Sequence, residues 1–306
     1  MQLKDYIPNI DKRYGETFFS GISFDSSKVK KDNIFFAIKG NKLDGNNYIN
    51  LAIKKGAKII VSEKKIKKRN NIIFLHSSNV RKLLAEISFK TLKKKPKKIV
   101  AVTGTNGKSS VADFYYQLLH LNSKKVASIG TIGVKYYKKK NNIKNTTLDP
   151  IQLSSIFKDL IKDKVEYVIM EASSHGLKQN RLDGLSFDTG IFTNLSHDHL
   201  DYHKNMNAYF KAKLYLFDKL IKKNGNIITD VNIPQCKKIK DIAEKKKFKL
   251  DLIYNKKKGL DLILHKFLGE KQILEIGFEK KKYVIELNLI GKIQINNILM
   301  AIQAAY

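Results

Sequence analysis

Short apolar runs alternate with amphipathic stretches through the central part of the chain. A short apolar run bounded by turn residues is typical of a buried strand, and apolar residues repeating every three to four positions are typical of a helix. The pattern predicts strands over 99–103, 126–130, 165–170 and 187–193, and helices near 108–121, 151–163 and 205–222. This alternation favours an α/β fold with a mostly parallel sheet covered on both faces.

The first 90 residues are predicted to form a separate α/β domain. Its buried strands and helical stretches are expected over 34–38, 48–55, 57–61 and 79–92. A lysine-rich run and Pro96 follow and indicate a hinge. The predicted domains are therefore 1–90 and 91–306.

The hydrophobic period changes beyond about residue 245. Residues 283–289 alternate with a period of two, as do parts of 260–278, which predicts an antiparallel β extension. The final stretch, 296–306, is an apolar helical run without a stop signal, so we expect that the chain is truncated within a helix.

The stretch 102–110, Val-Thr-Gly-Thr-Asn-Gly-Lys-Ser-Ser, links a predicted strand to a predicted helix. Backbone N–H groups in such a turn point at an anion, and the helix dipole adds partial positive charge. In this interpretation Lys108 reaches terminal phosphate oxygens, and the Ser109 hydroxyl binds a phosphate-linked Mg2+. The expected nucleotide contacts are Gly104, Thr105, Asn106, Gly107, Lys108, Ser109 and Ser110.

The spacing of this motif leaves an alternative. The general phosphate-loop pattern has four residues between its glycines, whereas two residues separate Gly104 from Gly107. An ordinary surface turn is therefore the competing interpretation. The flanking strand and helix favour a nucleoside triphosphate site.

A carboxylate follows the predicted strand 165–170, at the start of Glu171-Ala-Ser-Ser-His-Gly-Leu177. Open α/β sheets gather their ligands at the C-terminal ends of parallel strands. Glu171 would complete the coordination of an Mg2+ that Ser109 and the phosphates hold. The alternative is an acidic residue that only caps the next turn.

A histidine-rich segment follows the predicted strand 187–193. Its metal-ligand residue types are His197, His199, Asp201 and His203. They suggest a paired-zinc hydrolase, but the register of that motif fails by one because position 202 is Tyr202. Turn-forming His and Asp residues are the other alternative.

Charge and composition restrict the partners. The chain has 306 residues with 59 Lys and Arg against 28 Asp and Glu, a net charge of +31. Its lysine runs lack the interleaved aromatic residues of a base-stacking platform. The Lys, Asn and Ile content resembles that of an A+T-rich coding sequence, so we expect solvated lysine faces and no nucleic-acid partner. A basic NTPase that binds nucleic acid stays as an alternative.

The sequence also indicates a compartment. No apolar run approaches the roughly 18 residues that span a membrane, and no secretory signal opens the chain. The single cysteine, Cys236, excludes an internal disulfide. We expect a cytoplasmic monomer without a membrane partner.

Three motifs in order resemble the Mur ligases, ATP-dependent enzymes that add amino acids to the peptidoglycan precursor. These are the stretches 104–110, 171–177 and 194–203. Within the family, Glu-Ala-Ser-Ser-His-Gly-Leu and Asp-His-Leu-Asp-Tyr-His are similar to the members that add the third amino acid to UDP-N-acetylmuramoyl-L-alanyl-D-glutamate. The stretches Phe24–Ser27 and Asn33–Gly40 are similar to the family's uridine-binding N-terminal domain.

The resemblance implies a set of substrate contacts. At the UDP end they would be Ser26, Asn41, Lys42 and Leu43. For the muramyl-dipeptide they would be Asn145, Thr146, Thr147, Ser173, Gln179 and Arg181. Ser27 departs from the family pattern, which usually has Arg there.

The resemblance also implies the metal and adenine contacts. His199 matches a ligand of a second Mg2+, and Lys213 matches the lysine that the family carbamylates with CO2 to give an oxygen ligand. Asn297 matches the adenine side of a G-x-x-N-x-x-N motif in which Gln294 replaces the first Asn. Catalysis would then rest on Lys108, Glu171, His199 and Lys213.

The implied reaction activates the D-glutamate side-chain carboxylate with ATP as an acyl phosphate, which the amine of an amino acid then attacks. We expect meso-diaminopimelate as that amino acid, with L-lysine as the alternative. The family's C-terminal domain is expected to be absent, so the chain should bind nucleotide but turn over poorly. A folylpolyglutamate synthetase-like ligase shares the ATP core and is a second alternative.

Overall fold

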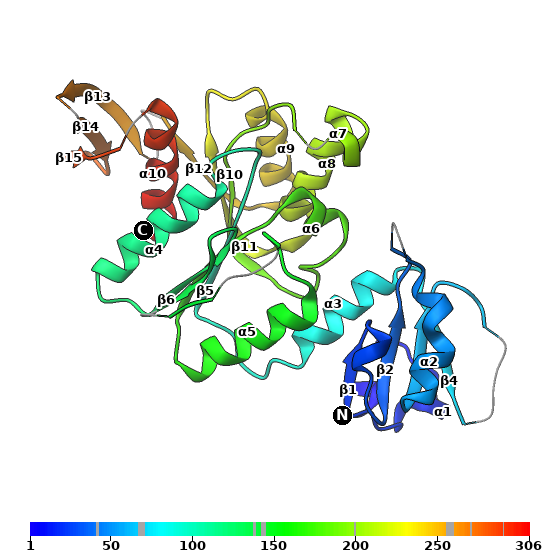
Figure 1. Cartoon of the computed structure of the whole chain (residues 1–306). Helices are drawn as coiled ribbons and strands as arrows, with labels where there is room; N and C mark the ends of the chain where they lie inside the picture. Colours follow the sequence, from blue (N-terminus) through cyan, green and yellow to red (C-terminus); the bar gives the residue numbers. More distant parts are fainter. Residues whose placement is uncertain are drawn as a thin grey trace. The chain divides into compact units, whose positions relative to one another are not determined.

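The computed structural model describes residues 1–40, 43–66, 71–136, 139–141, 145–198, 200–254, 260–269, 271–289 and 291–306. They fall into two compact units, both drawn in Figure 1. The first unit comprises Met1–Lys93, Asp149–Lys158 and Gln179–Leu185, and the second comprises Lys94–Leu148, Asp159–Lys178 and Ser186–Tyr306. The sequence predicted one boundary near residue 90, whereas two later segments pack with the N-terminal unit.

A four-stranded parallel sheet forms the centre of the first unit. Its strands are, in order, β1 (Gly21–Ser23), β2 (Asn33–Ala37), β3 (Ala57–Ser62) and β4 (Ile73–His76). Side chains of β2 alternate between two apolar clusters, with Ile34 and Phe36 in one and Phe35 and Ala37 in the other. Helix α3 (Val80–Lys90) contributes to the first cluster and α2 (Ile49–Lys54) to the second, so β2 is buried on both faces.

Later segments of the chain complete this unit. Phe157, on helix α5 (Pro150–Lys162), packs edge to face on Phe89 with ring centroids 6.4 Å apart. The amide of Asn79 donates to Asn180 Oδ1 at 3.1 Å. Aromatic burial and this polar contact explain why 149–158 and 179–185 belong with the N-terminal residues.

An eight-stranded sheet forms the centre of the second unit. Its order is β12 (Lys249–Ile253), β11 (Ile221–Asp230), β10 (Phe187–Phe192), β5 (Lys98–Thr103), β9 (Tyr167–Glu171), β6 (Val126–Gly130), β7 (Gly133–Tyr136) and β8 (Lys139–Asn141). The strands from β12 to β6 are parallel, and β7 and β8 are antiparallel. The expected mostly parallel sheet is confirmed.

Helices cover both faces of this sheet, as consecutive residues of β10 demonstrate. Ile191 belongs to the apolar cluster that contains residues of α4 (Lys108–Leu121) and α10 (Lys292–Ala305). The next residue, Phe192, packs its ring on Phe210 of α8 (Met206–Tyr215) and on Phe217, with centroids 5.8 and 6.2 Å apart. Successive side chains of a strand point to opposite faces, so α4 and α10 lie on one face and α8 on the other.

One predicted element ends earlier than expected. The helix predicted over 205–222 is α8 followed by a π-helical turn, Leu216–Leu220, and the chain is extended from Ile221 onward. Ile221 pairs with Phe187 of β10, so sheet pairing overrides the apolar helical period at this point. The predicted helix was therefore wrong at its last two residues.

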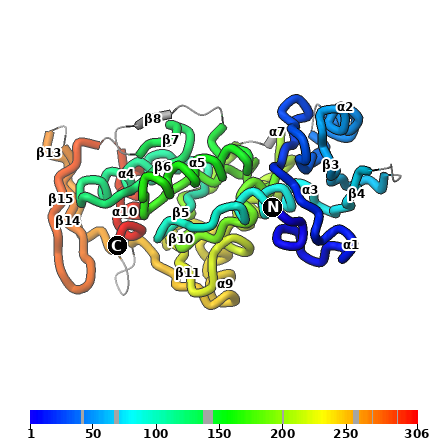
Figure 2. The backbone as a smooth tube through the Cα atoms, turned by 90° about the horizontal axis from the view of Figure 1, so that it is seen from below, coloured from blue at the N-terminus to red at the C-terminus, as the bar shows by residue number. Residues whose placement is uncertain are grey.

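The predicted antiparallel extension is confirmed as a three-stranded sheet of β13 (Asp261–Leu268), β14 (Lys271–Phe278) and β15 (Lys281–Leu287). Leu274 and Ile276 of β14 are buried in the cluster that α4 and α10 share. Figure 2 shows β14 and β15 beside α4 and α10. The extension therefore covers the two helices that flank the loop between β5 and α4.

Helices α1 (Lys12–Gly15), α6 (Ser174–Lys178), α7 (Leu200–His203) and α9 (Cys236–Lys246) complete the fold. Throughout the part of the chain that the structure describes, no helix has both the length and the apolar character that crossing a bilayer requires.

Candidate phosphate-binding site

A glycine-rich loop joins the end of β5 to the first residue of α4. Gly107 caps this helix with a φ of 85°, a conformation that favours glycine. A side chain at Gly107 would overlap the amide of Asn297, and one at Gly104 would overlap the Thr193 hydroxyl. The loop therefore requires both glycines, and Asn297 lies directly against it.

Several hydrogen bonds hold the loop to the segment that follows β10. The N–H of Thr105 donates to the carbonyl of Asn194 at 2.9 Å, and the N–H of Asn106 donates to Asn194 Oδ1 at 3.0 Å. Thr193 Oγ1 donates to the carbonyl of Asn106 at 2.6 Å. These two loop N–H groups are thus engaged within the protein. The N–H groups of the first turn of α4 have no intrahelical partner, so they are the ones available to bind an anion.

A cavity of about 320 Å³ opens at this helix N-terminus. Its lining residues are Thr105, Asn106, Gly107, Lys108, Ser109, Ser110, Thr131, Thr146, Glu171, Ser173, Ser174, Tyr209 and Lys213. Most of them carry hydroxyl, amide or charged groups, so the cavity suits a polar, charged ligand.

Lys108 is turned back onto its own loop. Its Nζ donates to the carbonyls of Thr105 at 2.7 Å and Gly104 at 3.1 Å. Burial lowers the pKa of this ammonium, and the carboxylates of Glu171 and Asp198 act in the opposite direction. Lys108 is therefore a partly desolvated cation at the helix N-terminus, where a phosphate would supply a compensating negative charge.

Lys213 is a buried lysine on α8, 1% exposed. Its Nζ donates to the carbonyl of Gly104 at 2.6 Å and lies 4.2 Å from the ring centroid of Tyr209. Burial first, and then the charge of Lys108, lower the pKa of Lys213 to about 7, while Asp198 opposes the shift. This amine therefore loses its proton more readily than an exposed lysine does.

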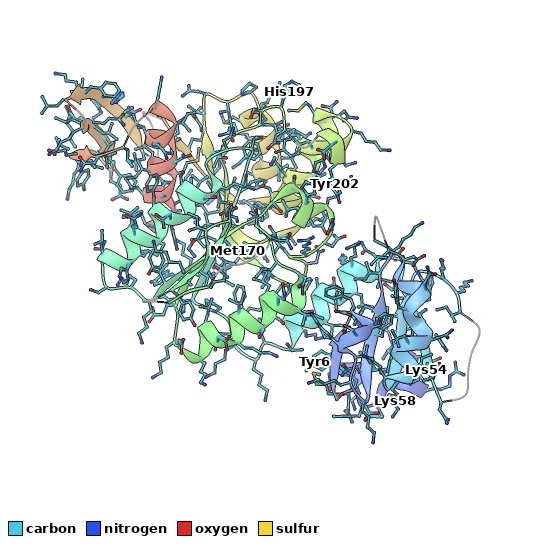
Figure 3. All side chains as sticks on the ribbon, in the orientation of Figure 1. Tyr6, Lys54, Lys58, Met170, His197 and Tyr202 are labelled. Carbon is cyan, nitrogen blue, oxygen red and sulfur yellow. The ribbon has the colours of Figure 1, made fainter. Side chains whose placement is uncertain are left out.

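Glu171 ends β9 with a carboxylate that is 1% exposed, directly after Met170, which Figure 3 labels. Its Oε1 accepts from the N–H of Thr131 at 2.8 Å, and its Oε2 accepts from the Thr131 hydroxyl at 3.1 Å. Because each carboxylate oxygen has two lone pairs, lone pairs remain for a cation. The position at the C-terminal edge of a parallel sheet agrees with the prediction.

The cavity collects many of the predicted residues: Thr105, Asn106, Gly107, Lys108, Ser109, Ser110, Thr146, Glu171, Ser173 and Lys213. Gly104 and Asn297 adjoin this set through the contacts given above. Thr147 is buried and does not line the cavity, and its hydroxyl donates to the carbonyl of Glu171 at 3.0 Å. Asn145 is exposed and does not line the cavity.

Other predicted contacts belong to the first unit. Ser26 opens the short 3-10 helix Ser26–Lys28, and Leu43 is 66% exposed. Gln179 Oε1 accepts from the Arg181 guanidinium at 2.8 and 3.1 Å. Asn41, Lys42 and His199 lie outside the described residues.

The histidine-rich segment divides into exposed and buried residues. His197, labelled in Figure 3, is exposed. His203 is 1% exposed, and its Nε2 lies 3.0 Å from the hydroxyl of Ser174. Within the described ranges, which leave out His199, no group of three His, Cys, Asp or Glu side chains is placed to hold a metal ion.

The sequence analysis missed three residues of this cavity, which are Thr131, Ser174 and Tyr209. Thr131 follows the predicted strand 126–130, so the sheet-edge argument that identified Glu171 would also have identified it. Tyr209 lies four residues before Lys213 on α8 and hence on the same helix face. Its hydroxyl is 3.3 Å from Thr105 Oγ1, which links α8 to the loop.

Comparison with known proteins extends these observations. The profile of the Mur ligase middle domain matches residues 102–305, and that of the Mur ligase family catalytic domain matches residues 19–93. A UDP-N-acetylmuramoyl-L-alanyl-D-glutamate–2,6-diaminopimelate ligase of Rickettsia montanensis is 36% identical over 96% of this chain and 62% of its own length. The same-named protein of Buchnera aphidicola is 37% identical over 92% of this chain and 60% of its own length.

Solved structures agree with the sequence comparison. A structure of a UDP-N-acetylmuramoyl-L-alanyl-D-glutamate–2,6-diaminopimelate ligase superposes with a TM-score of 0.88, at 26% identity, over 100% of this chain and 63% of that one. A MurF ligase of Thermotoga maritima in complex with ADP, at 19% identity, shares the fold with a TM-score of 0.62 over 92% of this chain and 61% of that one.

The chain spans about three-fifths of the length of the curated relatives it matches. The Mur ligase middle-domain profile covers residues 102–305, and the fold is built around the loop at Gly104 and Gly107. Together these findings establish that this chain belongs to the Mur ligase family.

Proposed function

We propose that this chain is part of an ATP-dependent ligase that adds meso-diaminopimelate to UDP-N-acetylmuramoyl-L-alanyl-D-glutamate. The observation that carries the proposal is the convergence of Lys108, Glu171 and Lys213 on one cavity at the N-terminus of α4. The names of the relatives support the choice of substrates.

In this proposal the ATP triphosphate lies against the first turn of α4. Lys108 turns from its two backbone carbonyls toward the phosphates, and the free N–H groups of the turn donate to phosphate oxygens. Asn297 lies against Gly107, so the adenine is proposed to bind beside the start of α10.

The donors at this site fit Mg2+. Glu171 and the Ser109 hydroxyl are hard oxygen ligands beside the phosphate position. Mg2+ is commonly held by one or two carboxylates together with phosphates and water, so a cluster of three protein ligands is not required. When bound, the ion would neutralise phosphate charge. For a second ion we propose His199 and a carbamate on Lys213.

The surroundings of Lys213 support carbamylation. The neutral amine attacks the carbon of CO2, a C–N bond forms, and the nitrogen loses a proton to solvent, which leaves an anionic carbamate. A pKa near 7 provides the neutral amine that this step needs. The product replaces a buried cation by an anion beside Lys108, so the electrostatic conflict between the two lysines becomes an attraction.

The first unit is proposed to bind the UDP end of the substrate through Ser26, Asn41, Lys42 and Leu43. The muramyl-dipeptide would contact Asn145, Thr146, Thr147, Ser173, Gln179 and Arg181. A guanidinium such as that of Arg181 suits bidentate binding of a carboxylate.

The proposed reaction joins two anions in its first step. The side-chain carboxylate of D-glutamate attacks the γ-phosphate of ATP and releases ADP, giving an acyl phosphate. The amine of the amino acid then attacks the acyl carbon, and phosphate leaves as the amide forms. Lys108 and the helix N-terminus stabilise the charge that builds up on the transferred phosphoryl group.

Phosphate release tests this function. UDP-N-acetylmuramoyl-L-alanyl-D-glutamate and ATP are supplied with meso-diaminopimelate or L-lysine, to this chain and to one extended to the length of its relatives. We expect diaminopimelate-dependent release from the extended chain. Release only with L-lysine would replace the proposed amino acid, and no release with either would refute the ligase proposal.

A further inference from the structure

One residue, Thr131, supplies both donors that hold the Glu171 carboxylate. The backbone N–H of Thr131 binds one oxygen at 2.8 Å and the hydroxyl of Thr131 binds the other at 3.1 Å. A carboxylate held at both oxygens has a fixed rotation about its last torsion angle, so the direction of its free lone pairs is fixed as well.

The backbone beside Thr131 is shaped for this contact. Strands β6 and β9 are parallel neighbours, with Ile129 paired to Met170, so the residues that follow them meet at the sheet edge. A side chain at Gly130 would overlap the Glu171 carboxylate. Gly130 thus leaves the space that lets the carboxylate reach Thr131.

The hydroxyl network has a defined direction. Thr131 has one hydroxyl proton, which it donates to the Glu171 carboxylate. Thr146 Oγ1 lies 3.0 Å from Thr131 Oγ1, so Thr146 must be the donor in that pair. The hydroxyl of Thr146, a proposed substrate contact, therefore presents lone pairs to the cavity and accepts hydrogen bonds from a ligand.

We propose that Thr131 is a positioning residue for the divalent cation, acting through Glu171 and aligning Thr146 on the substrate side. This inference rests on the proposed function in one respect, that Glu171 binds a metal. Loss of the Thr131 hydroxyl frees one carboxylate oxygen to turn away, while the backbone N–H still holds the other. Residues that orient a metal ligand typically contribute a factor of roughly 10 to 100 in metal affinity.

The test uses Mn2+ as a paramagnetic probe, titrated into the 306-residue chain in the presence of ADP and followed by electron paramagnetic resonance. Thr131→Val removes the hydroxyl and keeps the shape, and Thr131→Ser keeps the hydroxyl. We expect Mn2+ to bind Thr131→Val at least 10-fold more weakly than the unmodified chain, and Thr131→Ser within about threefold of it.

Thr189→Val is the matched control, because Thr189 is a buried threonine on β10 that does not line the cavity. ADP affinity in EDTA and the thermal unfolding midpoint show whether each variant is folded. Unchanged Mn2+ affinity in Thr131→Val, or equal weakening in Thr131→Ser or Thr189→Val, would overturn the inference and leave the proposed function standing. Absence of Mn2+ binding in the unmodified chain would overturn both.

Discussion

The ammonium groups of Lys108 and Lys213 donate hydrogen bonds to the same backbone oxygen, the carbonyl of Gly104, at 3.1 and 2.6 Å. Two lysines that share one acceptor repel each other, and this repulsion contributes to the low pKa of Lys213. An anion placed between them removes the conflict. The protein without ligand therefore holds positive charge at the position that the triphosphate is proposed to fill.

Substitution of Lys108 tests the phosphate contact. We expect Lys108→Ala to lower ATP-dependent turnover of the extended chain by a factor of about 100 or more, because the principal cation at the transferred phosphoryl group is lost. Binding of the UDP-linked substrate should persist. ADP formation and substrate affinity by calorimetry are the measurements, and normal ADP formation in the variant would contradict the assignment.

The burial of Lys213 should make stability depend on pH. Its pKa is lowered from 10.5 to about 7 in the folded chain, so above pH 7 the unfolded state binds more protons than the folded state. The free energy of unfolding should thus rise between about pH 7 and pH 10. Below pH 7 Lys213 is protonated in both states, so it adds no pH dependence there and the full cost of burying its charge is present.

Lys213→Met removes the free-energy cost of burying the protonated lysine. The variant should be stabilised most below pH 7, by on the order of 5 kcal/mol as an upper bound, and the gain should shrink toward pH 10. Urea unfolding at a series of pH values measures it. Lys211→Met, an exposed neighbour on α8, is the control, and a gain independent of pH would show that charge burial is not the cause.

Carbamylation of Lys213 predicts a direct spectroscopic signal. With 13C-labelled bicarbonate at about pH 8, a carbamate resonance should appear in the carbon NMR spectrum of the chain. It should be lost in Lys213→Met and kept in Lys211→Met. Persistence of the signal in Lys213→Met would assign it to another amine.

Gly107 offers a test of the loop's shape. Gly107→Ala combines a positive φ with overlap of the Asn297 amide, so we expect about 1–3 kcal/mol lower stability and at least about 10-fold weaker ADP binding. Gly269→Ala has a comparable φ of 61° but no atom within 4 Å of the new carbon, so ADP affinity should not change. Equal ADP affinity in both variants would show that the contact with Asn297 is unimportant.

The sequence predicted the elements with strong hydrophobic signals. Strand 126–130 and helix 108–121 agree with β6 and α4 in both bounds. Two strands carry little periodicity: β1, with only three residues, and β11, in which the polar stretch Lys222–Gly225 follows Ile221. These strands form because a neighbouring strand pairs with them, which a local pattern does not report.

The site shows the same division. The loop and Glu171 follow from motif and strand order, whereas the burial of Lys213 depends on the packing of α8 against the loop, and only the family resemblance indicated it. The roles of the first unit's predicted residues, such as Ser26 and Arg181, stay predictions.

The first unit is assembled from three separate segments of the chain, and this affects how it folds during synthesis. Its core includes Phe157, and its polar contacts include Asn180, both of which are translated long after the strands of that unit. Nascent domains generally fold as soon as their sequence has emerged. Here the first unit stays incomplete until residue 185 has left the ribosome, by which time β5, α4 and β9 have also been synthesised. The maturation of the two units is consequently interleaved, and no single proteolytic cut releases either of them whole.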